Sequence, residues 1–361
     1  MKMNYKIAVI VGGPSPEHDI SILTGLQSAR ILSSKNEVSI IYWTKDNKWF
    51  LLDSKLESAD FLDTSKLKKK ELQIYLGKNG GFYHKRKTLD IDVFINSCHG
   101  GPGEDGTLQG LLDIMDVNYT GPNLTSAQLC MDKYAFYSLM KENSIPVLEK
   151  FKIQHTKKPN FEGPYVLKPQ FGGSSIGVEV VDNYETALKI IESSDLYEKG
   201  ALLESYLENA DDLLIGVRNF PVFNFSEIEK PIRNTNLFSY EDKYLNNGGL
   251  EGSKRELPAG ISKESENIIT EYVEQINNII PSRGIVRYDF LKINEDIYIN
   301  EINTIPGSHA LYLWKNLDVA KYELLIDIVD EALSDTNKGW SIQGSDGVAL
   351  KSATDIQSKL G

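Results

Sequence analysis

The sequence predicts a mixed α/β protein, and three features of its patterning support this. Apolar runs at Lys6–Val11 and Val38–Trp43 flank a Gly-rich turn and a periodic helix near residues 19–33, which together form a βαβ opening. Residues 165–207 are rich in short strands and turns. A later helix places six apolar residues on one face, namely Ile268, Ile269, Tyr272, Val273, Ile276 and Ile280. Such a face requires a packing partner, so sheets covered by helices are expected.

The chain is long enough for more than one domain, because its 361 residues exceed the roughly 150 residues of an average domain. Composition shifts towards strands and turns after about residue 121 and changes again near residue 207. We therefore predict domains at 1–121, 122–207 and 208–340, with a tail of undefined role at 341–361.

Individual elements can be placed between these boundaries. A strand at Asp92–Asn96 is expected to run into a Gly-rich loop, and the next helix to start at Glu104 or Asp105, where a carboxylate suits the helix dipole. Asn123 is a candidate N-cap for one helix that reaches about Asn143.

Charge and composition disfavour several classes of protein. Acidic residues number 51 and basic residues 39, a net charge of -12, and such a surface repels nucleic-acid phosphates. No apolar stretch approaches the roughly 18 residues of a membrane span, and the N-terminal apolar run ends in Gly-Gly instead of a cleavage site. Cys98 and Cys130 provide no disulfide framework. We expect a cytoplasmic protein without a nucleic-acid or membrane partner.

Gly-rich loops with polar side chains follow predicted strands, which is where α/β folds bind ligands. The loop GGPSPEHDIS places Glu17 and His18 near a helix start, although a plain Gly-Gly turn is the structural alternative. The loop KPQFGGSSIG combines Lys168 with two glycines and two serines, whose amides and hydroxyls suit phosphate oxygens. A flexible hairpin loop is the alternative there. The sequence has no P-loop motif, and no GxGxxG follows the first strand, which argues against a dinucleotide-binding dehydrogenase.

The segment RYDFLKINEDIYINEINTIPG predicts a hairpin that carries oxygen ligands. Alternate residues of a strand share a face, so Arg287 lies with Asp289, and Glu301 with Asn303. Carboxylate and amide oxygens are the ligands that Mg²⁺ prefers beside nucleotide phosphates. A solvated polar face is the alternative, but the apolar neighbours predict burial, where unpaired carboxylates are costly.

Six blocks of this sequence resemble the D-alanine-D-alanine ligases of the ATP-grasp superfamily and occur in that family's order. The blocks are GGPSPEHDIS, HGGPGEDGTLQGLLD, YTGPN followed by MDK, KPQFGGSSIG, SYEDKY, and RYDF with NEINTIPG. The likeness extends from about residue 6 to residue 335. It implies an ATP-grasp fold of three domains, in which an N-terminal substrate-binding α/β domain precedes a central and a C-terminal β-rich domain that clamp ATP.

The resemblance also implies an activity. One amino acid's carboxylate takes the γ-phosphoryl group of ATP, and the amine of a second amino acid attacks the acyl phosphate, so that a dipeptide and ADP form. Two D-alanines are the default substrates, with a role in cell-wall peptidoglycan synthesis. Phosphoryl transfer depends on positioning and charge neutralisation, which agrees with the lysines, Gly-rich amides and acidic hairpin. ATP, two Mg²⁺ ions (or Mn²⁺) and a homodimer are implied by the family.

Matching the motifs residue by residue gives the implied sites. The nucleotide contacts are Lys133, Lys168, Ser174, Ser175, Glu204, Leu207, Asp211 and Lys243. The metal ligands are Asp289, Glu301 and Asn303. The catalytic set is Glu17, Ser174, Tyr244, Arg287 and Gly307. The family's ribose-binding glutamate is absent here, and either Asp211 or Asp212 is a candidate to replace it.

In this resemblance Glu17 holds the ammonium group of the donor amino acid and forms a hydrogen-bonded trio with Ser174 and Tyr244. Arg287 and the Gly307 amide stabilise the oxyanion. The structural alternatives are an ordinary surface lysine for Lys133 and a loop histidine for His99.

The acceptor segment departs from the family. The family runs Phe-Thr-x-x-Ser after NTxPG, whereas this chain runs SHALYLW, with Tyr312 in the serine's place. The resemblance implies that Glu17 and His99 bind the substrates, with His99 near the donor carboxylate. The departure puts Tyr312 in a remodelled acceptor pocket. The alternative functions are an ATP-grasp dipeptide ligase of different acceptor specificity, in natural-product or modified cell-wall biosynthesis, and a nucleotide-binding protein without catalysis.

Overall fold

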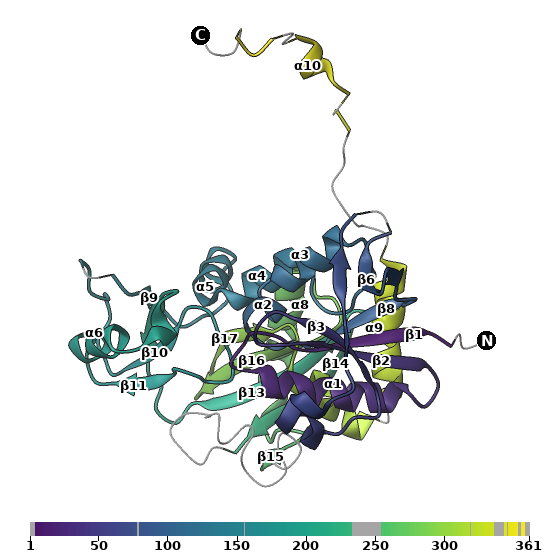
Figure 1. Ribbon diagram of the computed structural model, residues 1–361. Helices are drawn as coiled ribbons and strands as arrows, with labels where there is room; N and C mark the ends of the chain where they lie inside the picture. Colours follow the sequence, from purple (N-terminus) through teal and green to yellow (C-terminus); the bar gives the residue numbers. More distant parts are fainter. Residues whose placement is uncertain are drawn as a thin grey trace.

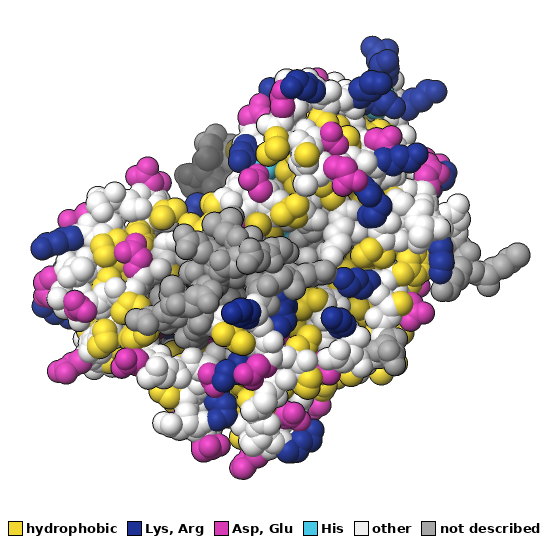
Figure 2. All heavy atoms as spheres, turned by 90° about the horizontal axis from the view of Figure 1, so that it is seen from below, with side chains coloured by type: hydrophobic (Ala, Val, Ile, Leu, Met, Phe, Trp, Pro, Cys, Tyr) yellow, Lys and Arg dark blue, Asp and Glu magenta, His cyan; other side chains and the backbone are white. Residues whose placement is uncertain are grey.

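The computed structural model describes residues 4–77, 79–154, 156–232, 254–317 and 319–335, and in the tail residues 343–344, 346–352 and 355–357. Across these residues the fold is a mixture of helices and several sheets (Figure 1). Within the described ranges no helix is both long enough and apolar enough to cross a bilayer. Acidic and basic side chains are interspersed with hydrophobic ones over the face shown in Figure 2.

The strands and helices have the following bounds. The strands are β1 (Lys6–Gly12), β2 (Glu37–Trp43), β3 (Trp49–Asp53), β4 (Lys70–Glu71), β5 (Gln73–Tyr75), β6 (Gly81–His84), β7 (Lys87–Thr88), β8 (Val93–Asn96), β9 (Lys150–Lys152), β10 (Tyr165–Pro169), β11 (Glu179–Val181), β12 (Ala201–Ser205), β13 (Asp211–Arg218), β14 (Asn224–Pro231), β15 (Arg255–Glu256), β16 (Ile285–Ile293) and β17 (Asp296–Asn303). The helices are α1 (His18–Leu32), η1 (Ser58–Lys66), α2 (Gly101–Glu104), α3 (Thr107–Ile114), α4 (Leu124–Met131), α5 (Lys133–Glu142), α6 (Tyr184–Glu192), η2 (Asp195–Tyr197), α8 (Lys263–Ile279), η4 (Gly307–Leu317), α9 (Lys321–Ser334) and α10 (Val348–Ser352).

The predicted βαβ opening is confirmed by the first sheet. Its strand order is β4-β3-β2-β1-β8, and β1 pairs in parallel with both β2 and β8. After Lys6, the sequence of β1, KIAVIVG, has no polar side chain, because a central parallel strand is buried on both faces. Loops at the carboxyl ends of β1 and β8 carry Glu17 and His99, so the parallel arrangement brings these loops to one edge of the sheet.

Among the described residues, two larger antiparallel sheets accompany the first sheet, besides a small sheet of order β5-β6-β7. One has the order β11-β10-β12-β9 and the other the order β15-β14-β13-β16-β17. The predicted hairpin is confirmed as β16 and β17, in which Asp289 pairs with Glu301 and Arg287 with Asn303. The prediction that alternate residues of these strands share a face, Arg287 with Asp289 and Glu301 with Asn303, therefore agrees with the register of the hairpin.

The helix predicted from its apolar face is α8, which packs on the β13-β16-β17 sheet. Ser262 caps it, accepting a hydrogen bond from the Ser265 amide. Ile269, Val273 and Ile276 are fully buried in the same cluster as the β16 and β17 side chains. The apolar face of α8 thus packs against the sheet, as the spacing of its six apolar residues predicted.

Two helix predictions were wrong in detail. The single helix expected from Asn123 to Asn143 is two helices, α4 and α5, because Asp132 leaves the helical conformation and caps the second one with its side chain. The helix expected to start at Glu104 or Asp105 is instead a short turn, α2, that ends at Glu104, followed by α3.

Packing crosses the domain ranges that we predicted from the sequence. Phe136 and Met140 of α5 lie in the core of the C-terminal sheet, although they fall within 122–207. Leu325 and Val329 of α9 pack with Trp314 against the first sheet, although they fall within 208–340. The ranges remain predictions, but the cores are built from segments distant in the chain.

Candidate active site

Two neighbouring cavities lie where the sheets meet. We call the first the inter-sheet cavity; its lining includes Val166 and Glu204 from one antiparallel sheet and Leu214 and Leu291 from the other. The second, the loop cavity, is lined largely by the Gly-rich loops and by residues that follow β17. The two cavities share five lining residues: Lys133, Gly172, Gly173, Leu214 and Glu301.

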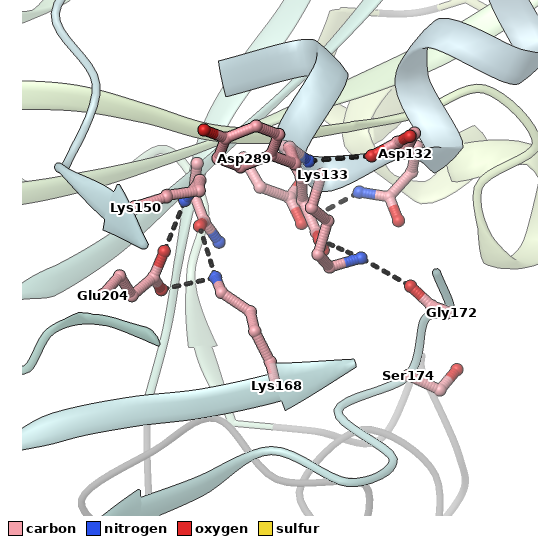
Figure 3. Close-up of polar contacts among 12 residues, drawn as sticks. Asp132, Lys133, Lys150, Lys168, Gly172, Ser174, Glu204 and Asp289 are labelled. Carbon is pink, nitrogen blue, oxygen red and sulfur yellow. Dashed lines mark hydrogen bonds and ion pairs between the residues drawn. The ribbon is translucent and has the colours of Figure 1, made fainter. Parts of the chain in front are cut away.

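Two lysines converge on one buried glutamate in the inter-sheet cavity (Figure 3). Lys150 and Lys168 form ion pairs with the two carboxylate oxygens of Glu204, and all three side chains are buried. Lys168 Nζ also lies 3.4 Å from Asn300 Oδ1. Antiparallel pairing of β9, β12 and β10 sets this arrangement, because Glu204 stands opposite both Lys150 and Val166.

The cluster keeps one net positive charge in a buried position. Burial lowers the pKa of Lys168 to about 8, the Glu204 charge opposes this shift, and Lys150 adds to it. Burial works to raise the pKa of Glu204, but Lys150 and Lys168 outweigh it and hold that pKa well below its usual range. Glu204 is therefore anionic at neutral pH, and Lys168 is a cation that loses its proton more readily than a solvated lysine.

Lys133 lies at the first position of α5 and reaches both cavities. Its Nζ donates to the Gly172 carbonyl at 2.5 Å and lies 3.4 Å from Glu301 Oε2. The cap residue Asp132 accepts hydrogen bonds from two α5 amides and from Gln170 Nε2 at 2.8 Å. The break between α4 and α5 thus directs Lys133 towards the Gly-rich loop. A surface lysine would not make these contacts.

The two serines of KPQFGGSSIG face different cavities. Ser174 lines the loop cavity and Ser175 the inter-sheet cavity. Both residues have a positive φ, 54° and 58°, so the backbone turns sharply between them. The single loop therefore supplies one hydroxyl to each cavity.

The strand β13 carries Asp211 and Asp212, the two candidates for the ribose-binding residue, and turns their side chains in opposite directions. Asp212 lines the inter-sheet cavity, as do Leu207 and Glu204. Asp211 points away and forms an ion pair with Lys230 at 2.9 Å. Successive residues of a strand face opposite sides, so only one of the pair can face the inter-sheet cavity, and that residue is Asp212 instead of Asp211.

Glu17 is held where three Gly-rich segments meet. Its buried carboxylate accepts a hydrogen bond from the Ser174 hydroxyl. Gly100 and Gly173 lie close to this carboxylate. A Cβ added at Gly100 would lie 2.2 Å from Glu17 Oε2, and one added at Gly173 would lie 2.9 Å from it. Only glycine permits this approach, which explains the Gly-rich composition of both loops around one carboxylate.

The loop after β8 is hydrogen-bonded to the segment that follows β17 through His99 and Glu104. The His99 ring contacts the Ile305 carbonyl through Nδ1 at 2.7 Å and Thr24 Oγ1 through Nε2 at 2.8 Å. Glu104 accepts hydrogen bonds from the Ile305 amide at 3.0 Å and the Thr304 hydroxyl at 3.2 Å. Burial lowers the pKa of His99 to about 4, so the ring is neutral. Burial, with the nearby Glu17 charge, raises the pKa of Glu104 to about 7.

The hairpin gathers the residues predicted to bind metal. The Asp289 carboxylate accepts hydrogen bonds from Arg287 Nε at 2.7 Å, Arg287 Nη2 at 2.9 Å and Asn303 Nδ2 at 3.0 Å. Its register partner Glu301 lines both cavities. In the described part of the chain no three His, Cys, Asp or Glu side chains form a metal cluster. Two carboxylates and one amide are nevertheless the kind of hard oxygen donor that Mg²⁺ prefers.

The remaining predicted residues divide into two groups. Gly307 and Tyr312 line the loop cavity together with Arg287. Lys243 and Tyr244 lie outside the described residues, so the trio of Glu17, Ser174 and Tyr244 is described for its first two members only.

Several residues of the site were not found from the sequence. Lys150, Asp132 and Glu104 were missed, as were Glu229 and Arg255 in the wall of the loop cavity. The block HGGPGEDG contains Glu104, but its carboxylate had been assigned to a helix start. No local pattern marks Lys150, because its role depends on a strand partner more than fifty residues away.

Comparison with known proteins gives the same assignment independently. Residues 6–122 match the family model described as the D-ala D-ala ligase N-terminus, and residues 126–329 match the D-ala D-ala ligase C-terminus. The D-alanine-D-alanine ligase of Thermosipho melanesiensis is 33% identical over 350 residues, covering 91% of this chain and 93% of that protein. The chain belongs to the D-alanine-D-alanine ligase family.

Solved structures with that family name have the same fold. The Coxiella burnetii D-alanine-D-alanine ligase has a TM-score of 0.78 at 20% identity and covers 99% of both chains. The Bacillus anthracis enzyme, solved as a complex with ATP, has a TM-score of 0.64 at 21% identity and covers 91% of this chain and 97% of its own. The predicted ATP-grasp fold is confirmed, and family membership makes the chain an ATP-dependent, dipeptide-forming ligase.

Proposed function

We propose that this D-alanine-D-alanine ligase family member joins two D-alanine molecules, with ATP converted to ADP and phosphate. The observation that carries the proposal is the pair of cavities that share Lys133 and Glu301. A nucleotide in the inter-sheet cavity would present its terminal phosphate to a carboxylate in the loop cavity. The relatives that carry the D-alanine-D-alanine name favour this substrate pair over the alternative of a different acceptor.

The nucleotide side of the proposal uses two lysines that line the inter-sheet cavity. Lys133 and Lys168 would neutralise phosphate oxygens, and Ser175 would donate a hydroxyl to them. Glu204 and Leu207 line the inter-sheet cavity where an adenine ring would lie between the two sheets. Asp212 is the candidate for the ribose hydroxyls.

The substrate side uses the groups of the loop cavity. Glu17 would hold the donor ammonium group, and its hydrogen bond with Ser174 fixes that carboxylate. Arg287 and the Gly307 amide would stabilise negative charge on the carbonyl oxygen during attack by the acceptor amine. His99 lines the same cavity near the predicted donor carboxylate, and because both ring nitrogens contact protein atoms it acts there as a neutral positioning group.

Asp289, Glu301 and Asn303 are the proposed ligands of two Mg²⁺ ions. When bound, these ions would supply positive charge to the phosphates, which Lys133 and Lys168 provide only in part. Family resemblance also underlies two further proposals: a homodimer, and a cytoplasmic enzyme of peptidoglycan synthesis.

The test is ADP release by the purified protein with ATP, Mg²⁺ and D-alanine, with the dipeptide identified by mass spectrometry. We expect D-alanyl-D-alanine to form together with ADP in equal amounts. Asp289→Asn should lower kcat by on the order of 100-fold, because a charged ligand is lost from the phosphate side. The exposed Asp90→Asn is the matched control and should retain activity. ADP release only with another amino acid would reject D-alanine, and full turnover by Asp289→Asn would reject the metal site.

A further inference from the structure

Tyr312 reaches the loop cavity from an unusual backbone turn. Ser308, His309 and Ala310 all have positive φ, at 53°, 47° and 51°, a conformation unfavourable for consecutive residues with side chains. Two contacts hold the turn: the Ser308 amide donates to Thr24 Oγ1 of α1 at 3.1 Å, and His309 Nε2 lies 3.1 Å from Ser97 Oγ, which follows β8. These contacts fix the turn that leads to Tyr312.

Arg255 lies on the ring of Tyr312 and belongs to the same cavity wall. Its guanidinium carbon is 4.5 Å from the ring centroid, and its Nη1 is 3.0 Å from Glu229 Oε1. Arg255, Glu229 and Tyr312 line the loop cavity together with Arg287 and Gly307. The acceptor side of the cavity thus contains an arginine fixed by a ring and a buried carboxylate.

The geometry suits recognition of a second carboxylate. When a guanidinium stacks on a ring, its N–H groups point outward in the plane, where they donate hydrogen bonds. A guanidinium carries five N–H donors, so one arginine can bind more than one carboxylate. A planar arginine held in one orientation binds a carboxylate through two parallel hydrogen bonds more strongly than a mobile cation does.

The other cations of the loop cavity have different geometry. Arg287 makes a two-point contact with Asp289 on the hairpin, and Lys133 contacts Gly172 and Glu301 on the side shared with the inter-sheet cavity. Glu17, on the opposite set of loops, is proposed to hold the donor ammonium group. Arg255 is thus the cation placed beside the residue that replaces the family's acceptor-site serine.

We propose that Arg255 binds the carboxylate of the acceptor amino acid, and that Tyr312 and Glu229 hold its guanidinium in position. This inference rests on the proposed function, because it names the residue that selects the second amino acid. Where the family has a serine hydroxyl, this chain has Tyr312, and the guanidinium of Arg255 on β15 lies beside it.

The experiment is a competition between D-alanine and D-alaninamide as acceptors. D-alaninamide has the same amine but no carboxylate, so it cannot act as the donor. The wild-type protein is given ATP, Mg²⁺ and both compounds, and the ratio of the dipeptide to the dipeptide amide is measured by mass spectrometry. Both products share the donor step, so their ratio reports the acceptor site alone. Comparing this ratio between variants cancels the intrinsic difference between the two amines.

The expected change is large. In Arg255→Ala/Glu229→Gln the preference for D-alanine should fall by about 10- to 100-fold, the equivalent of one hydrogen-bonded charged group. The second substitution avoids leaving a buried carboxylate without its cation. Arg255→Lys keeps the charge but loses the planar fork, and we expect a smaller fall. Arg30→Ala, which breaks the exposed pair with Glu57, is the matched control and should keep the wild-type ratio.

Each outcome decides the question. A wild-type product ratio in the Arg255→Ala/Glu229→Gln protein overturns the inference while leaving the ligase function intact. If that protein fails to fold, an unchanged ratio in Arg255→Lys overturns it instead. If the wild-type protein forms neither product from D-alanine, the proposed function fails, and the role of Arg255 fails with it.

Discussion

Lys168 is a buried cation whose charge is sensitive to pH. Burial lowers its pKa to about 8, so its proton is lost over a range where an exposed lysine, with a pKa near 10.5, stays charged. A phosphate-binding lysine acts through its charge. Binding of the nucleotide should therefore weaken as the pH rises through the pKa of Lys168.

We predict that kcat/KM for ATP falls as the pH rises from about 7 to 9, since this ratio reports ionisation of the free enzyme. In Lys168→Arg the fall should disappear, because an arginine stays protonated throughout this range. The measurement is ADP release at limiting ATP across this pH range. Parallel pH profiles for the two proteins would show that Lys168 does not control nucleotide binding.

At the scale of elements, the start of α5 decides where Lys133 points. Asp132 both caps this helix and accepts a hydrogen bond from Gln170, at the edge of the Gly-rich loop. The cap therefore links helix stability to the position of the lysine shared by the two cavities.

Asp132→Ala should lower the free energy of unfolding by about 1 kcal/mol through loss of the cap. It should also raise KM for ATP roughly fivefold, the equivalent of one hydrogen bond of about 1 kcal/mol. Ser262→Ala removes the cap of α8, away from both cavities, and serves as the control. Thermal unfolding and ATP titration measure the two effects. Equal ATP affinity in both variants would mean that the cap does not position Lys133.

At the scale of the whole molecule, the segment after β17 joins the C-terminal sheet to the first sheet. Trp314 of η4 is fully buried with side chains of β1, β2 and α9. Its indole also lies against β13, where Gly216 leaves room for it. A Cβ at Gly216 would lie 2.6 Å and 2.7 Å from two ring carbons of Trp314.

Gly216→Ala should therefore lower the free energy of unfolding by about 1–3 kcal/mol, because a buried indole in close packing cannot move aside. The measurement is the midpoint of denaturant unfolding. Gly260→Ala is the control, since its nearest neighbour would lie 3.6 Å away at the end of a glutamate side chain. Equal midpoints for the two variants would contradict this account of the packing between sheets.

Local patterns were sufficient for much of the fold and for the family. The apolar run of β1, the face of α8 and the alternation along β16 and β17 each follow from a period of 2 or 3.6 residues. The break at Asp132 was missed because its cap depends partly on Gln170, on another element. Helix periodicity alone continues through that position.

The sequence by itself determined the α/β class, the hairpin that carries Asp289 and Glu301, and membership of an ATP-dependent ligase family. Only the tertiary structure decided that Asp212 instead of Asp211 lines the inter-sheet cavity, that Lys150 joins Lys168 at Glu204, and that Arg255 lies on Tyr312. The physical reason is that periodicity fixes which residues share a face. Which face borders a cavity depends on packing between segments that are far apart in the chain.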